Sequence, residues 1–91
     1  MDFEWDPQKS AQNRAKHGIL FADAVGVFED ALALWQEEPG RYQEERFIAL
    51  GKDYLDRVLV VVFTLRDQRI RLISARRATR REIKQYEQKS E

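Results

Sequence analysis

Seven arginines lie close together near the end of the chain. Asp67 is the one acidic residue among them, and they occupy positions 66, 69, 71, 76, 77, 80 and 81. The planar guanidinium of arginine can pair with two phosphate oxygens through parallel hydrogen bonds. The segment therefore predicts contacts with phosphate groups. A solvated basic face, or a surface that docks acidic residues of a protein partner, would have the same composition.

Arg76 is the arginine that we favour for chemistry. It lies at the end of a predicted strand, close to the start of the last predicted helix, where free backbone amides add to an anion site. Under strict alternation, Arg69 and Arg71 share one face of that strand, whereas Ser74 and Arg76 share the other unless a bulge intervenes. On that reading, the two sets would not easily contact one substrate.

His17 and Glu45 are the candidates for proton transfer. Histidine changes its charge near neutral pH, and His17 is the one histidine of the chain. Its place at a predicted helix end favours the cationic form, which suits an acid or a phosphate ligand better than a base. Lys16 faces another direction on that helix, so the two would rarely bind one phosphate. Both residues could equally serve only to complement the helix end.

Glu45 and Arg46 are neighbours on a predicted strand and therefore point to opposite faces. Glu45 is suited to act as a general base if an arginine fixes its carboxylate, and otherwise it is an ordinary surface residue. Tyr86 could stack on a base or donate a proton, or it could anchor the last helix by pointing inward.

The elements that position these residues follow from caps, turns and hydrophobic periodicity. Asp6 and Pro7 begin a polar helix that ends at Gly18, and its only apolar stripe is Ala11 and Ala15. Thr79 and Glu82 have the spacing of a capping box. Strands are predicted over residues 3–5, 31–35, 46–50, 57–65 and 69–75, and helices over 7–17, about 21–29 and after 79. Residues 57–65 are apolar on both faces and belong in the centre of the sheet. The order predicts an α+β fold with a largely antiparallel sheet.

Composition limits the possible classes of protein. The 91 residues form one domain, 1–91, and 43% of them are hydrophobic, which is enough for a core. With no cysteine and one histidine, sulfur-ligated and multi-histidine metal sites are excluded within one chain. The longest apolar run, 58–63, is too short for a membrane span, so we expect a cytoplasmic protein. Residues 1–45 carry 4 basic and 10 acidic side chains, and residues 46–91 carry 12 and 6. This asymmetry hints at a polyanionic partner for the second half, or at two halves that neutralise each other.

The chain also resembles the BrnT toxin family over about residues 3–86. The N-terminal signature is similar in Trp5-Asp6-Pro7, Lys9, Asn13, Lys16-His17-Gly18-Ile19 and Phe21. The strand region and closing helix are similar in Glu45-Arg46, Gly51, Arg71-Leu72-Ile73-Ser74-Ala75-Arg76, Glu82 and Tyr86. The resemblance implies a RelE-like α+β fold with two N-terminal helices and a short C-terminal helix.

The same resemblance implies a type II toxin that cleaves RNA without a metal or other cofactor and blocks translation. It also implies a BrnA-like antitoxin with a ribbon-helix-helix part, a heterotetramer, and contact with operator DNA only through the antitoxin. The expected catalytic residues are His17, Glu45 and Arg76. The expected RNA-binding residues are Lys16, Arg46, Arg71, Arg80, Arg81 and Tyr86. The alternatives are a non-catalytic nucleic-acid-binding module and a protein-interaction module with a basic C-terminal half.

Overall fold

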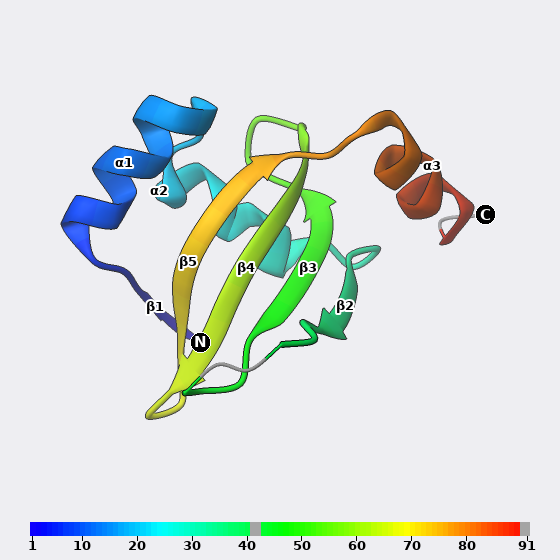
Figure 1. The fold of residues 1–91 in the computed structure, drawn as a ribbon. Helices are drawn as coiled ribbons and strands as arrows, with labels where there is room; N and C mark the ends of the chain where they lie inside the picture. The colour runs from blue at the N-terminus through cyan, green and yellow to red at the C-terminus, as the bar shows by residue number, and fades with distance from the viewer. Residues whose placement is uncertain (41–42, 90–91) are drawn as a thin grey trace.

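A five-stranded sheet forms the centre of the fold (Figure 1). The computed structural model describes residues 1–40 and 43–89. Across the sheet the strands are β1 (Asp2–Glu4), β5 (Arg69–Arg77), β4 (Val58–Arg66), β3 (Phe47–Lys52) and β2 (Leu34–Glu37). β4 is the middle strand, which confirms the central position predicted from its two apolar faces.

One face of the sheet is covered by helical segments of the N-terminal half. α1 (Pro7–His17) lies beside β5, and α2 (Phe21–Ala24) and the 3-10 helix η1 (Val25–Glu29) cross behind the strands in Figure 1. The carboxylate of Asp6 accepts the Gln8 N–H at 2.8 Å, and Gly18 ends α1 with a left-handed φ of 72°. Both ends of α1 are therefore as predicted. The main core under these helices contains Ile19, Phe21, Val27, Leu59, Val61, Phe63, Ile70 and Leu72, all fully or almost fully buried.

Three predicted features of the fold need correction. The sheet is mixed rather than largely antiparallel, because β1 pairs with β5 in parallel orientation. The second N-terminal helix is only four residues long and continues as η1, where Gly26 lies so close to the β3–β4 turn that an added Cβ would stand 2.5 Å from the Tyr54 nitrogen. β2 starts at Leu34 rather than at residue 31, because Asp30 makes a turn by accepting the Leu32 N–H at 3.0 Å.

A β-bulge in β5 decides which arginines share a face. Val62 pairs with Ser74 and Phe63 pairs with Leu72, so Ile73 is an extra residue on β5. The bulge reverses the alternation of side chains at this point. Arg69, Arg71, Ser74 and Arg76 consequently lie on the same face of the sheet, opposite the core under α2 and η1. The division between two faces that strict alternation predicts does not occur, because a bulge intervenes.

The face that carries these arginines is called the open face here. Its far end is covered by α3 (Arg80–Lys89), which begins with the predicted capping box: Thr79 N–H donates to Glu82 at 2.8 Å, and Glu82 N–H donates to the Thr79 hydroxyl at 3.2 Å. Tyr86 anchors α3 in a second small core with Leu50 and Val60. Among residues 1–40 and 43–89, no helix combines the length and apolar character needed to cross a membrane.

Candidate functional site

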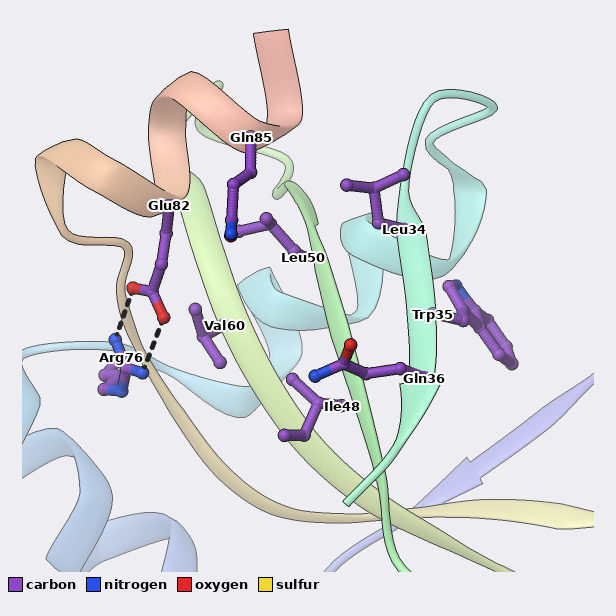
Figure 2. Close-up of a pocket in the computed structure, with 9 residues that line it drawn as sticks. All are labelled: Leu34, Trp35, Gln36, Ile48, Leu50, Val60, Arg76, Glu82 and Gln85. Carbon is purple, nitrogen blue, oxygen red and sulfur yellow. Dashed lines mark hydrogen bonds and ion pairs between the residues drawn. The ribbon is translucent and has the colours of Figure 1, made fainter. Parts of the chain in front are cut away.

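A groove of about 360 Å³ lies on the open face between α3 and the sheet (Figure 2). Its floor is apolar and includes Ile48, Leu50 and Val60, which come from β3 and β4. One wall is formed by Arg76 of β5 and Glu82 of α3. We call this the α3 groove. It combines an apolar surface on which a flat ring can lie with a guanidinium that can bind an anion.

Arg76 and Glu82 form a two-pronged ion pair at the wall of the α3 groove. The two hydrogen bonds join Nη1 to Oε1 at 2.9 Å and Nη2 to Oε2 at 3.0 Å. The hydrogen bonds from Arg76, together with the Thr79 N–H, lower the pKa of Glu82 to about 2 despite its partial burial. The same pair raises the pKa of Arg76. Glu82 is therefore ionised at neutral pH and holds the guanidinium in a fixed orientation, with N–H groups left over for a second anion.

The remaining arginines of the open face also have carboxylate partners. Glu4 of β1 lies 3.5 Å from Arg71 and 3.9 Å from Arg69, and Glu44 lies 3.5 Å from Arg66. These distances are longer than those of the Arg76 pair, and such exposed pairs are weak. The open face is thus a line of arginines that are oriented by carboxylates but keep donors free.

A second cavity, of about 230 Å³, lies between α1 and β5. Its polar walls come from Lys9, Lys16 and His17 of α1 and from Ser74 of β5. We call it the α1–β5 cavity. Lys16 and His17 therefore share one cavity, contrary to the prediction that they face different directions. The reason is that α1 lies against β5 through a polar stripe, and a lysine side chain is long enough to turn toward a neighbouring surface.

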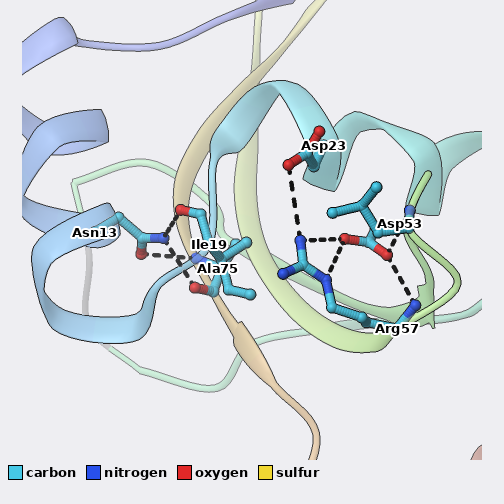
Figure 3. A network of polar contacts seen from close by, with 7 residues as sticks. Asn13, Ile19, Asp23, Asp53, Arg57 and Ala75 are labelled. Carbon is cyan, nitrogen blue, oxygen red and sulfur yellow. Dashed lines mark hydrogen bonds and ion pairs between the residues drawn. The ribbon is translucent and has the colours of Figure 1, made fainter.

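Asn13 holds α1 in this position (Figure 3). Its amide donates to the carbonyl oxygens of Ile19 at 3.0 Å and Ala75 at 2.9 Å, and it accepts the Ala75 N–H at 3.0 Å. β1 pairs with only the first part of β5. Farther along β5, the backbone of Ala75 bonds to the Asn13 side chain instead of to a further strand. Because Asn13 is buried, these bonds fix α1, and with it the α1–β5 cavity, against the strand.

A separate polar network in Figure 3 has a structural role. The buried carboxylate of Asp53 accepts N–H groups from Leu55 and from the backbone and guanidinium of Arg57, at 2.7–3.0 Å. The carboxylate of Asp23 also lies 3.8 Å from the Arg57 guanidinium. These bonds close the β3–β4 turn and tie it to α2, so Arg57 is occupied in holding the fold together.

The other residues expected in the site are scattered. Glu45 is exposed just before β3, where its carbonyl oxygen accepts the Thr64 hydroxyl at 2.6 Å, and Arg46 follows it half-buried. Arg80 and Arg81 are exposed at the start of α3. Tyr86 is only 4% exposed and donates its hydroxyl to Asp30 at 2.6 Å, which leaves too little ring surface for stacking on a base. We assign Tyr86 to the packing of α3.

Three residues that organise these sites were not predicted as site residues from the sequence. Glu4 and Glu82 orient the arginines, and Asn13 positions α1. For Asn13, the available signal was the spacing of Lys9, Asn13 and Lys16 at i, i+4 and i+7, because residues at this spacing lie on one side of a helix. For the bulge, the signal was the phase change at Ile73, where Leu72 and Ile73 are consecutive apolar residues.

Comparison with known proteins places this α+β domain in a class of small ribonuclease toxins. The family described as "Ribonuclease toxin, BrnT, of type II toxin-antitoxin system" matches residues 5–82. The fold is similar to the crystal structure of the Brucella abortus ribonuclease toxin BrnT, with 26% sequence identity, a TM-score of 0.64, and coverage of 88% of this chain and 99% of that chain. No curated protein matches the chain. The chain belongs to the BrnT family of type II toxins, and a toxin of this type has an antitoxin partner.

Proposed function

We propose that this toxin is an endoribonuclease that cleaves RNA without a metal and thereby blocks translation in the cytoplasm. The observation that carries the proposal is the place of Arg76. The bulge at Ile73 brings its guanidinium onto the open face with Arg69 and Arg71, and Glu82 fixes it at the wall of the α3 groove. A line of oriented arginines beside an apolar groove suits a phosphate backbone that carries unstacked bases.

The RNA strand would follow β5 along the open face. Arg69 and Arg71 would contact phosphates at one end, and the exposed Arg80 and Arg81 would contact them near α3. One base would enter the α3 groove against Ile48 and Val60. In this arrangement the scissile phosphate lies at Arg76, and its oxygens take the N–H donors that Glu82 leaves free.

Cleavage without a metal proceeds by attack of the 2′-hydroxyl, which gives up its proton to a base, on the phosphorus. The 5′-oxygen of the next nucleotide leaves and takes up a proton from an acid. The product ends are then a 2′,3′-cyclic phosphate and a 5′-hydroxyl. Arg76 would stabilise the charge that develops on the phosphorane. Glu82 is a poor base because its pKa is about 2, so its role is to position Arg76.

The two candidates for proton transfer are His17 and Glu45, and we favour His17. His17 and Ser74 both line the α1–β5 cavity. Ser74 lies two positions before Arg76 on β5. Glu45 lies at the start of β3 and lines neither cavity. His17 is therefore the better placed group to protonate the leaving oxygen.

Cleavage of a defined RNA by the purified chain in EDTA tests the proposal. Arg76→Ala should reduce the single-turnover rate by about 10²–10³, the usual loss when one donor to a developing negative charge is removed. Arg66→Ala is the matched control, because Arg66 lies at the turn end of β4 in a half-exposed pair with Glu44. It should change the rate little.

Two outcomes would contradict the proposal. Absence of cleavage by wild type in EDTA, with RNA binding retained, would indicate a non-catalytic nucleic-acid-binding module. A near-normal rate for a folded Arg76→Ala variant would place the active site elsewhere on the chain.

The antitoxin is proposed to be BrnA-like, with a ribbon-helix-helix part that alone contacts operator DNA, in a heterotetramer. The excess of basic residues in 46–91 favours a partner segment rich in acidic residues. Hydrogen exchange on the complex should show protection of the open face. Protection confined to residues 1–45 would contradict this arrangement.

A further inference from the structure

We propose that the α1–β5 cavity is a second phosphate-binding site, which holds the phosphodiester that neighbours the scissile one. The inference rests on the proposed function for the identity of the ligand as RNA. The anion-binding property of the cavity itself rests on the geometry of Lys9, Lys16, His17 and Ser74.

The cations of the cavity have no carboxylate partner. Among the ion pairs of residues 1–40 and 43–89, none involves Lys9, Lys16 or His17. Of the residues that the structure describes, no acidic side chain lines the cavity. Cations that lie close together around this open, shallow depression attract an anion more strongly than the same cations dispersed over the surface.

The cavity is formed before any ligand arrives. Asn13 ties α1 to Ala75 of β5 through two hydrogen bonds, so the wall that carries the lysines cannot move away from the strand without losing both. Gly18 turns the chain directly after His17 with a left-handed φ of 72°, which a residue with a side chain adopts only with strain. A preformed site binds its ligand without a large ordering cost.

The polar groups of the cavity suit a phosphate. Lys9 and Lys16 supply charge from flexible side chains, His17 supplies a ring N–H, and the Ser74 hydroxyl supplies a further donor from the opposite wall. This set can neutralise one phosphate, whereas the charge of Arg76 is already offset by the carboxylate of Glu82.

The cavity is close to the proposed cleavage site. Ser74 and Arg76 are two residues apart on a regular part of β5 beyond the bulge, which separates their Cα atoms by about 7 Å. Successive phosphates of a flexible single strand can span such a distance. An RNA strand with its scissile phosphate at Arg76 can therefore place the adjoining phosphate in the α1–β5 cavity.

The test uses the double variant Lys9→Gln/Lys16→Gln and leaves His17 intact. Lys52→Gln/Lys84→Gln is the control, because it removes the same charge from two exposed lysines that line neither cavity. A 2′-O-methyl RNA, which cannot be cleaved by the 2′-hydroxyl, is the binding probe. The slope of log K against log salt should become shallower by about 0.7 in the cavity variant, as expected for one lost phosphate contact with a single strand. The control should keep a steeper slope than the cavity variant.

Two further measurements separate this inference from the proposed function. Titration of wild type with inorganic phosphate should shift the amide signals of His17 and Ser74, and the cavity variant should lose these shifts. With cleavable RNA, the cavity variant should show a several-fold higher half-saturating concentration than wild type, and the control variant should not.

The outcomes are distinguishable. Equal salt slopes for the cavity and control variants, or no phosphate-induced shifts in wild type, would overturn the second phosphate site even if Arg76 proved essential for cleavage. Phosphate-induced shifts in a wild type that cleaves no RNA would overturn the proposed function and support the cavity as an anion site.

Discussion

The two basic regions of this toxin differ in how their charges are held. On the open face, Arg69, Arg71 and Arg76 are each near a carboxylate of the protein, and Arg76 forms a short two-pronged pair with Glu82. In the α1–β5 cavity, Lys9 and Lys16 have no such partner within the described part of the chain.

This difference indicates that the paired arginines of the open face are held in a fixed orientation, whereas the lysines of the α1–β5 cavity are suited to attract an anion. A carboxylate that fixes a guanidinium reduces its net attraction for RNA but presents its remaining donors in a set geometry, as catalysis requires. Unpaired lysines attract a phosphate from farther away and tolerate small changes in its position. The stability of each region should therefore respond to different substitutions.

Asn13→Ala should give the largest change in stability, because Asn13 anchors α1 to β5 through buried hydrogen bonds. It leaves the buried N–H and C=O of Ala75 without their partner, so we expect a loss of about 2–4 kcal/mol in the free energy of unfolding. Chemical denaturation measures this loss, with the exposed neighbour Gln12→Ala as control. Equal stability of the two variants would contradict the anchoring role of Asn13.

Lowering the pH should reduce the free energy of unfolding, because Glu82 becomes protonated and its pair with Arg76 is lost. The folded-state pKa of this residue is about 2 against an ordinary 4.5, so its contribution to stability is complete above pH 4.5 and is lost as the pH falls toward 2. We expect this contribution to be about 1–2 kcal/mol, because solvent around the partly exposed Arg76 screens the pair. Unfolding free energies measured across this range should fall less steeply for Glu82→Gln. An identical pH dependence would show that the pair does not stabilise the fold.

Tyr86→Phe should loosen the attachment of α3 over the groove. The hydroxyl donates to Asp30, and its loss should cost about 1–1.5 kcal/mol. Burial and the Asp30 carboxylate raise the pKa of Tyr86 to about 12 from 10.0, so wild type should lose stability as the pH rises from 10 through 12. Thermal unfolding at neutral and alkaline pH tests both effects. The variant should not lose this contribution at high pH, and a parallel decline in both proteins would exclude Tyr86 as its source.

Thr79→Ala should have the smallest effect, since its hydroxyl satisfies one exposed amide of α3 at 3.2 Å. We expect a loss of about 1 kcal/mol, seen as a lower melting temperature. The Thr79 N–H still donates to Glu82, so the Arg76 pair should survive and RNA cleavage should be retained. A large loss of cleavage in a folded variant would show that the cap and the arginine are coupled.

Local signals in the sequence were sufficient for much of the fold. The bounds of α1 follow from Asp6, Pro7 and Gly18, and the start of α3 follows from Thr79 and Glu82. Each of these signals acts within a few residues, through one cap or one turn, so no distant contact is needed to interpret it. The central place of β4 was equally accessible, because a strand that is apolar on both sides must be covered on both sides.

The arrangement of the site was decided by contacts between distant segments. A single extra residue at Ile73 hardly changes composition or periodicity, yet it moves Arg76 to the face that carries Arg69 and Arg71. The parallel pairing of β1 with β5 brings Glu4 to those arginines, and it depends on where α1 returns the chain. Ala11 and Ala15, the only apolar stripe of α1, are both exposed, and Asn13 faces β5 instead. The residue types and the local caps can be read directly from the amino-acid sequence. Which charges meet depends on strand pairing, register and packing, and these involve segments that lie far apart in the chain.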